Sequence, residues 1–231
     1  MSNAVSKFAL VLLLLSASGF THATMELNNV IFHFEPGESA RQDVEVFNSG
    51  EDTLYVEVEP AQVLSPGTPS EGRSMIRDPR KAGLLVTPNK LVIPAGESKL
   101  VRLVKLGNTS EEKVYRIATK PVVGGIEADQ SGLKVMIGYE VLAIVYPDDV
   151  KPNVEVQRKG KTLFVKNLGN TNVLFREGFQ CETPDTPKEE CEYLPGRRMY
   201  PGNEWQVELP RDLPVIYYQS IGTRNFVETY P

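Results

Sequence analysis

The chain has 231 residues, of which 41% are hydrophobic and 24% are charged, a composition typical of soluble globular proteins. Its formal net charge is −5 and it has no tract of basic residues, which argues against nucleic acid or an anionic membrane surface as partner. The length fits one large domain or two modest ones.

Residues 1–23 have the pattern of a secretory signal peptide. The single charge of Lys7 precedes an apolar run from Phe8 to Leu15, and Thr21-His22-Ala23 forms a small-x-small cleavage site. The alternative is a membrane anchor, but so short an apolar run cannot span a bilayer, and no later segment is long enough either. We therefore predict an exported protein cleaved near Ala23.

From residue 24 onward, short alternating segments separated by turn residues follow one another, and no helical period is sustained. This pattern predicts an all-β fold built from sandwiches. Residues 64–82 are rich in Pro, Gly, Ser and charge and are interpreted as a loop. Expected strands of the first half are 30–34, 43–47, 54–58, three short strands within 83–105, and 112–118.

One segment, residues 133–146, differs from an ordinary strand. Its odd positions are all apolar or aromatic, and its even positions become apolar from Leu142 onward. A period of two indicates extended chain with one dry face, and the second half should lie in a core. At about 3.3 Å per residue the run spans roughly 46 Å, so its first half can extend beyond its own sandwich. An apolar edge left open favours strand addition by another chain; the alternative is a cover supplied by its own domain.

Residues 148–152, which follow Pro147, resemble an interdomain linker. They divide the chain into a signal peptide (1–23), an N-terminal domain (24–147) and a C-terminal domain (153–231). Expected strands of the second domain are 153–157, 162–166, 172–175, 204–209, 215–218 and 226–230. Cys181 and Cys191, ten positions apart, predict a disulfide there, worth about 3 kcal/mol in the loop-entropy model.

Residues typical of catalysis or of metal binding are missing from the sequence patterns. His33 is the single histidine after residue 23, and no cluster has the spacing of a zinc or calcium site. Gly124-Gly125 is a lone pair in an expected hairpin loop and not a phosphate-binding loop. We expect a binding protein without cofactor, metal or enzymatic activity.

Residues 83–105 (GLLVTPNKLVIPAGESKLVRLVK) resemble periplasmic pilus chaperones of the chaperone–usher pathway, most closely the alternate branch that assembles colonisation-factor type fimbriae. Further matches are 112–117, the long strand ending at Tyr146-Pro147, and the cysteine pair followed by 199–202. The resemblance implies two immunoglobulin-like domains in a boomerang with a cleft between them. It also implies a periplasmic protein that binds pilins or an adhesin and delivers them to an outer-membrane usher.

Donor-strand complementation is part of what the resemblance implies. Alternate side chains of the long strand fill the groove that a pilin leaves open, and in this chain they are Leu133, Val135 and Ile137, with Tyr139 as a weaker fourth. Burial of three such side chains contributes roughly 5–9 kcal/mol before ordering costs.

The carboxylate anchor of better-known branches has no direct equivalent here. Those branches use one Arg on the first strand and one Lys on the long strand, whereas this chain has no cation on the first strand and Leu142 at the second position. Arg116 and Arg102, charges within apolar strands, are the candidates, since a carboxylate would suit a cation there. The alternative is an internal ion pair, for instance between Arg102 and Glu112.

A second hypothesis is an exported immunoglobulin-like adhesin or structural surface subunit. Such a protein should carry a donor extension before its first strand, but only a few residues separate Ala23 from the strand at 30–34. The short spacing favours the chaperone.

Overall fold

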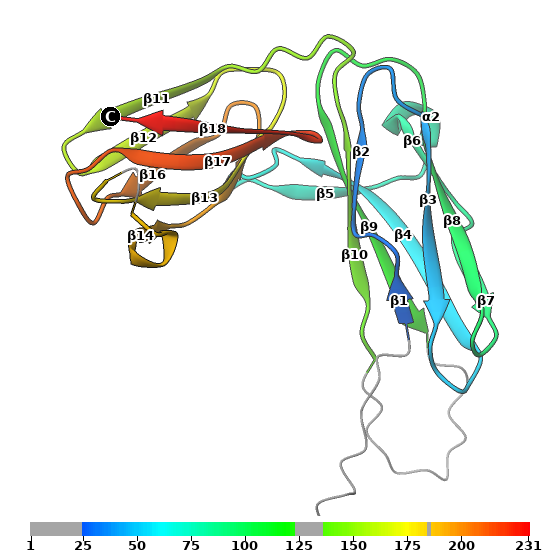
Figure 1. The fold of residues 1–231 in the computed structure, drawn as a ribbon. Helices are drawn as coiled ribbons and strands as arrows, with labels where there is room; N and C mark the ends of the chain where they lie inside the picture. Colours follow the sequence, from blue (N-terminus) through cyan, green and yellow to red (C-terminus); the bar gives the residue numbers. More distant parts are fainter. Residues whose placement is uncertain (1–24, 123–135, 184–185) are drawn as a thin grey trace, which may run out of the picture.

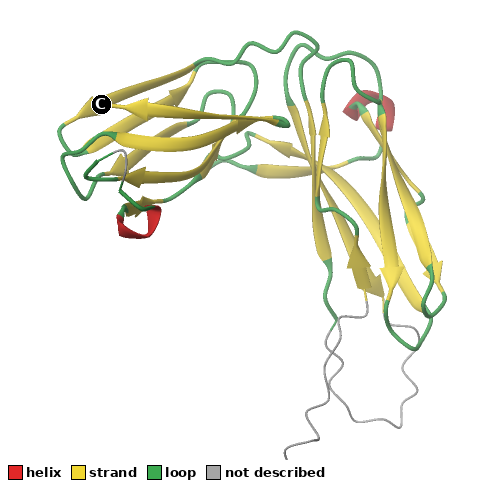
Figure 2. Cartoon of the chain, viewed as in Figure 1, coloured by secondary structure: helices red, strands yellow, loops and turns green. Residues whose placement is uncertain are grey.

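The computed structural model describes residues 25–122, 136–183 and 186–231, and the expected signal peptide lies outside them. The described chain is almost entirely β-structure, with two short helices (Figure 2). Neither of these helices is long and apolar enough to cross a membrane. The all-β prediction is confirmed.

The N-terminal sandwich packs two sheets face to face (Figure 1). One sheet has the order β1 (Met25–Leu27), β3 (Arg41–Asn48), β8 (Ser98–Lys105), β6 (Leu84–Thr87). The other has the order β2 (Ile31–Phe34), β10 (Tyr139–Val145), β9 (Lys113–Val122), β4 (Leu54–Leu64), β5 (Gly72–Met75), with β7 (Lys90–Ile93) also paired to β4. Alternate side chains of both sheets, such as Val44, Leu103, Tyr115 and Val141, form the core.

The C-terminal sandwich is smaller. One sheet comprises β11 (Val154–Lys159), β12 (Thr162–Asn167) and β16 (Glu204–Glu208). The other comprises β14 (Glu192–Leu194), β13 (Val173–Gln180), β17 (Val215–Ile221) and β18 (Arg224–Tyr230), with β15 (Arg197–Met199) paired to β13. Phe175 packs edge-to-face on Trp205 and Tyr217 at ring distances of 5.8 and 5.2 Å, which gives this core its aromatic centre.

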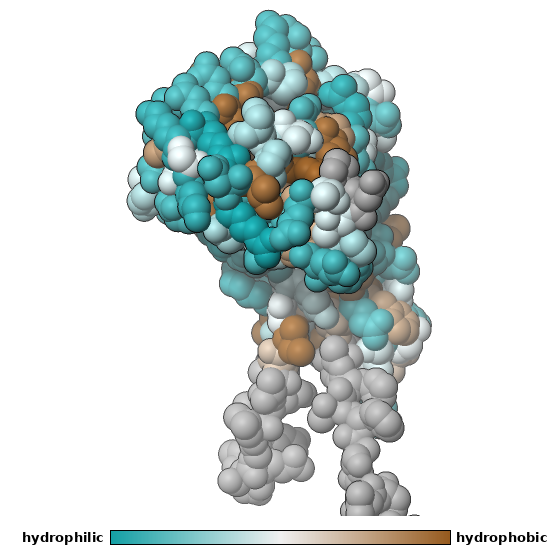
Figure 3. Space-filling view, turned by 60° about the vertical axis from the view of Figure 1, so that its left-hand side comes forward, coloured by the Kyte–Doolittle hydropathy of each residue, from teal (hydrophilic) through white to brown (hydrophobic). Residues whose placement is uncertain are grey.

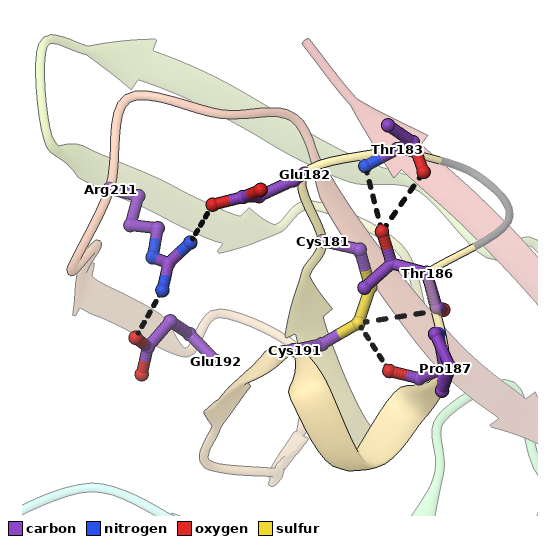
Figure 4. Close-up of a disulfide and its surroundings, with 8 residues drawn as sticks. All are labelled: Cys181, Glu182, Thr183, Thr186, Pro187, Cys191, Glu192 and Arg211. Atoms are coloured by element: carbon purple, nitrogen blue, oxygen red, sulfur yellow. Dashed lines mark hydrogen bonds and ion pairs between the residues drawn. A yellow bond between two sulfur atoms is a disulfide. The ribbon is translucent and has the colours of Figure 1, made fainter.

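The predicted disulfide joins Cys181 and Cys191, beside the short helix η2 (Lys188–Glu190) (Figure 4). Arg211 bridges Glu182 and Glu192, which flank the two cysteines, at 2.9 and 3.0 Å. The covalent bond and the two ion pairs therefore tie the same irregular segment to the sandwich.

The interpretation of residues 64–82 as a loop is wrong in two places. β5 (Gly72–Met75) pairs with the end of β4, and α2 (Pro79–Ala82) follows it. Asp78 caps α2 by accepting a hydrogen bond from the Arg80 amide at 3.0 Å, and Gly83 ends the helix with φ of 88°. A capping residue, a proline in the first turn and a glycine at the end are sufficient for one helical turn.

β4 also continues past Pro60 to Leu64, where the sequence pattern predicted an end. A proline can occupy a strand when its missing N–H is not needed by a neighbour. The Pro60 carbonyl accepts from the Ile76 amide, so the Pro60 nitrogen faces the same side, between the segments of β4 that pair with β7 and β5.

The two sandwiches meet at an angle, and the chain between them crosses at one end of β10 (Figure 1). An apolar cluster at this joint combines N-terminal side chains (Val63, Val114, Leu142, Ile144, Tyr146) with Tyr200 of the C-terminal sandwich. The hairpin after β4 also reaches across, since the carbonyls of Pro66 and Gly67 accept hydrogen bonds from Asn203 and Arg197 at 3.0 and 3.2 Å. Thr223 donates its amide to Glu35 at 2.7 Å. The joint is therefore packed and hydrogen-bonded from several directions.

Candidate functional site

β10 is shorter than the strand predicted over 133–146. The described strand begins at Tyr139, because its pairing with β9 begins at Tyr139 opposite Thr119. Met136–Gly138 precede it without regular structure, and Leu133 and Val135 lie outside the described residues. The second half behaves as predicted: Val141, Ala143 and Val145 face the sandwich core, while Leu142 and Ile144 face the joint.

One edge of β10 is open along its first half. β2 pairs with β10 in parallel, but only from Leu142 to Val145, and Val30 O accepts the Leu142 amide at 2.8 Å. Backbone groups of alternate residues point to the same edge, so those of Gly138 and Glu140 face this side as well. Within the described chain, no strand pairs with the edge before Leu142. The backbone there is available for another strand.

Ile137 lies where the core-facing row of β10 leaves its own sandwich. Its side chain is 55% exposed, although it is two residues before Tyr139 and alternates onto the same face. Tyr139 still belongs to the sandwich, since it packs on the core and donates its hydroxyl to Met25 O at 3.0 Å. In Figure 3 a hydrophobic area borders the grey segment at the lower end of the molecule.

Arg116 lies on the joint-facing side of the sheet, directly between Leu142 of β10 and Ala61 of β4. Val114, two residues earlier on the same face, belongs to the joint cluster. No hydrogen bond or ion pair of the Arg116 side chain is formed with any residue in the described ranges. Its charge contributes to lowering the pKa of Glu140, which shows that it lies near that carboxylate.

Arg73 forms a two-pronged ion pair with Glu140 on the same face. Arg73 lies on β5 and reaches across the sheet to β10, and its hydrogen bonds lower the pKa of Glu140. Since Glu140 is occupied by Arg73, Arg116 is left without a paired carboxylate of its own in the described structure. Sequence reasoning missed Arg73 because it lies in the segment interpreted as a loop.

Arg102, the second candidate anchor, lies on the other sheet and forms an internal ion pair. Its Nε donates to Asp43 Oδ1 at 2.9 Å from the directly opposite position on β3. This pair, followed by a contact from Arg41, lowers the pKa of Asp43. The expected internal pairing is therefore present, but its example was wrong: the partner is Asp43 and not Glu112.

Glu112 instead joins the two sandwiches. Its Oε2 accepts from Thr171 Oγ1 at 2.9 Å, from the Asn172 amide at 2.8 Å and from Asn172 Nδ2 at 2.7 Å. Its Oε1 is buried without a hydrogen-bond partner in the described structure. Burial therefore raises the pKa of Glu112, although the bonds from Asn172 and Thr171 oppose this.

The polar network continues from Asn172 to both sandwiches. Asn172 Oδ1 accepts from Arg198 at 2.5 Å, and its Nδ2 approaches the hydroxyl of Tyr146 at 3.4 Å. That hydroxyl also bonds His33 Nδ1 at 2.9 Å, and burial raises the pKa of Tyr146 to about 12. His33, with a pKa lowered mainly by burial, is thus a structural residue of the joint. Only the pairing between sandwiches brings these residues together, so no local sequence signal identified Asn172 or Arg198.

Candidate metal ligands do not cluster: no group of three or more His, Cys, Asp or Glu side chains among the described residues could hold an ion. The arrangement consists of an open strand edge, an exposed apolar side chain at its start and cationic side chains at its end. Such a combination can bind an extended polypeptide segment.

Comparison with known proteins gives the same kind of molecule. No family model matches the chain. It is 32% identical over 172 residues to a CS1 fimbrial protein of Escherichia coli, covering 70% of this chain and 71% of that protein. It is 25% identical over 182 residues to a CFA/I fimbrial protein of Escherichia coli, covering 75% and 76%.

Solved structures share the whole two-sandwich architecture. The class 5 fimbriae chaperone CfaA matches with a TM-score of 0.65 at 20% identity, over 90% of this chain and 99% of that one. The chaperone SafB of Salmonella enterica, in complex with the SafA pilin, matches with a TM-score of 0.59 at 16% identity, over 92% and 99%. The fold is thus that of fimbrial chaperones of the chaperone–usher pathway.

Sequence identity then places the chain within that class. It belongs to the family of the CS1 fimbrial protein, the colonisation-factor branch of these chaperones.

Proposed function

We propose that this chain captures fimbrial subunits by donor-strand complementation in the periplasm and passes them to an outer-membrane usher. The lent segment is the start of the long strand. Its side chains Leu133, Val135 and Ile137 enter the cargo, and Tyr139 lies at the boundary with the chain's own core. The activity is binding alone, with no chemical step. Residues 1–23 are the export signal, and 24–147 and 153–231 are the two domains.

The observation that carries this proposal is the open edge of β10 beside an exposed Ile137. An isolated exposed apolar side chain is common on protein surfaces, but this one continues the row that fills the sandwich core. Its backbone neighbours Gly138 and Glu140 face an edge on which the described chain places no strand. Exposed edges of this kind are normally blocked unless another chain uses them.

Arg116 is the better of the two anchor candidates. A strand added in parallel along the open edge must end near Leu142, where the Leu142 amide is already bonded to Val30. Arg116 is directly opposite Leu142 and has a side chain long enough to reach over it. A terminal carboxylate ending there would supply the anion that Arg116 lacks within the described structure.

The first experiment replaces Ile137 with Asp. Burying one isoleucine contributes about 1.5–3 kcal/mol, so loss of this contact and introduction of a charge should weaken capture roughly tenfold to a hundredfold or more. The fimbrial subunit that co-purifies with the wild-type chain from the periplasm serves as cargo, and yield and melting temperature are measured together.

Val92→Asp is the matched control, because Val92 is 53% exposed on β7. We expect both variants to melt close to wild type and only Ile137→Asp to lose the cargo. Wild-type yield with Ile137→Asp would refute the donor role of this position.

A second comparison tests the anchor. Arg116→Ala should reduce capture more than Arg102→Ala, since Arg102 already pairs with Asp43. Equal loss of cargo in both variants, or loss of folding in Arg116→Ala, would count against an anchoring role for Arg116.

The alternative function, an exported adhesin or structural protein of the surface, is tested by the same purification. A structural component would be recovered in surface fibres, whereas a chaperone should remain in soluble complexes with its cargo.

A further inference from the structure

We propose that Arg198 supplies a second cation to the anchor, so that one arginine from each sandwich holds the terminal carboxylate of the bound cargo. This inference rests on the proposed function, because it adds a contact to the same site. Arg198 lies on β15 of the C-terminal sandwich and Arg116 on β9 of the N-terminal sandwich.

Arg198 is held in place but is far from saturated. Its Nη1 donates to Asn172 Oδ1 at 2.5 Å, and Asn172 is itself fixed by three contacts: two to Glu112 and one to Tyr146. A guanidinium has five N–H donors, and no ion pair of Arg198 is present in the described parts of the chain. The remaining donors are oriented in advance for an anion.

Tyr200 shows that the two arginines approach the same place. Its ring packs with Leu142 and Ile144 in the joint cluster, and its neighbourhood contains both Arg198 and Arg116, whose charges each lower the pKa that burial raises. Arg198 also lies close enough to His33 to lower the pKa of that side chain.

The position of His33 relates Arg198 to the open edge. His33 is on β2, opposite Ile144 and two residues beyond Ile31, with which β2 begins opposite Leu142. A strand added along the open edge therefore ends with Arg116 across the sheet from it and Arg198 beyond it, toward the C-terminal sandwich. A carboxylate bound between them would connect the two sandwiches.

A purely structural role for Arg198 is the competing explanation, since its charge also lowers the pKa of the buried Glu112. The two roles differ in what they require of the cargo. A structural arginine affects every cargo alike, whereas an anchoring arginine matters only while a carboxylate lies within its reach.

The test crosses two changes. Arg198→Gln is combined with the co-purifying fimbrial cargo in two forms, one with its natural last residue and one with a single added glycine. The glycine moves the carboxylate by about 3.4 Å. Binding of each cargo form is measured by competition against the unlabelled cargo–chaperone complex, with melting temperature recorded for each variant.

The control is Arg176→Gln, because Arg176 likewise donates from Nη1 to an asparagine oxygen, that of Asn225 at 3.1 Å, but does so on the exposed surface of β13. We expect Arg198→Gln to weaken binding of the natural cargo at least tenfold and binding of the extended cargo by less than threefold. Arg176→Gln should change neither.

Equal weakening of both cargo forms by Arg198→Gln would overturn the proposal and leave a structural role. No weakening of either would overturn it as well. Failure of the proposed function is distinguishable, because then the wild-type chain would retain no cargo, and Ile137→Asp would have no effect.

Discussion

Removal of the Glu112 carboxylate should uncouple the two sandwiches. Glu112→Ala leaves the Thr171 hydroxyl, the Asn172 amide and the Asn172 side-chain nitrogen without the oxygen that now accepts from all three. Both Thr171 and Asn172 are fully buried, so water cannot simply replace the lost acceptor.

The expected cost follows from counting these bonds. A hydrogen bond to a charged group contributes about 1.5–3 kcal/mol. Asn172 Nδ2 retains Tyr146 as a weak second acceptor at 3.4 Å, so two of the three bonds are counted in full. Their loss should lower the free energy of unfolding by about 3–6 kcal/mol.

Calorimetry and urea unfolding at pH 7 measure this effect, and we expect a single transition of the wild-type chain to split into two as the sandwiches become independent. Glu59→Ala is the control, because Glu59 pairs with Lys120 at 2.5 Å on the exposed surface and should contribute less than about 1 kcal/mol. A loss below about 1 kcal/mol in Glu112→Ala, with one transition retained, would refute this account of the joint.

Three further predictions concern stability. Because burial raises the pKa of Glu112, the folded state holds its proton more tightly, and the stability of the wild type should fall as pH rises from about 4.5 through the raised pKa; melting temperatures of Glu112→Gln relative to wild type should rise over that window, and a flat difference would contradict the shift. Replacing both Cys181 and Cys191 with Ala should lower the free energy of unfolding by about 3 kcal/mol in urea titrations, and an unchanged midpoint would show that the loop is held by other contacts. Gly178→Ala should destabilise the C-terminal sandwich by about 1–3 kcal/mol, because the new Cβ would lie 2.5 Å from the Tyr217 ring; Gly160→Ala, in open space but at φ of 57°, should cost about 1 kcal/mol.

Local pattern predicted most strands of this chain because each one buries one face. The alternation of β3 and β12, and the two-sided apolar run of β10 after Leu142, reflect burial that the structure confirms. The disulfide was predictable because the chain has only two cysteines.

What the sequence could not specify is which residues meet across the joint. Glu112 bonds to Asn172, sixty positions later, and neither residue has a local pattern that marks it. Arg102 and Arg116 look alike in sequence, since both are charges within apolar strands, but they belong to different sheets and, among the described residues, only Arg102 has an acid opposite it. The helix at Pro79–Ala82 was missed although its capping residues were readable, because a single turn carries no hydrophobic period.

The parallel pairing of β2 with the upper half of β10 has a consequence for cargo selection. Ile31 opposite Leu142 acts as a stop, so the chain's own first strand measures how far an incoming terminal segment can advance. Subunits served by one such chaperone should therefore share a fixed number of residues between their last groove-lining side chain and their final residue. Shortening or lengthening that tail would shift the register by single residues, which in a strand turns every side chain to the wrong face.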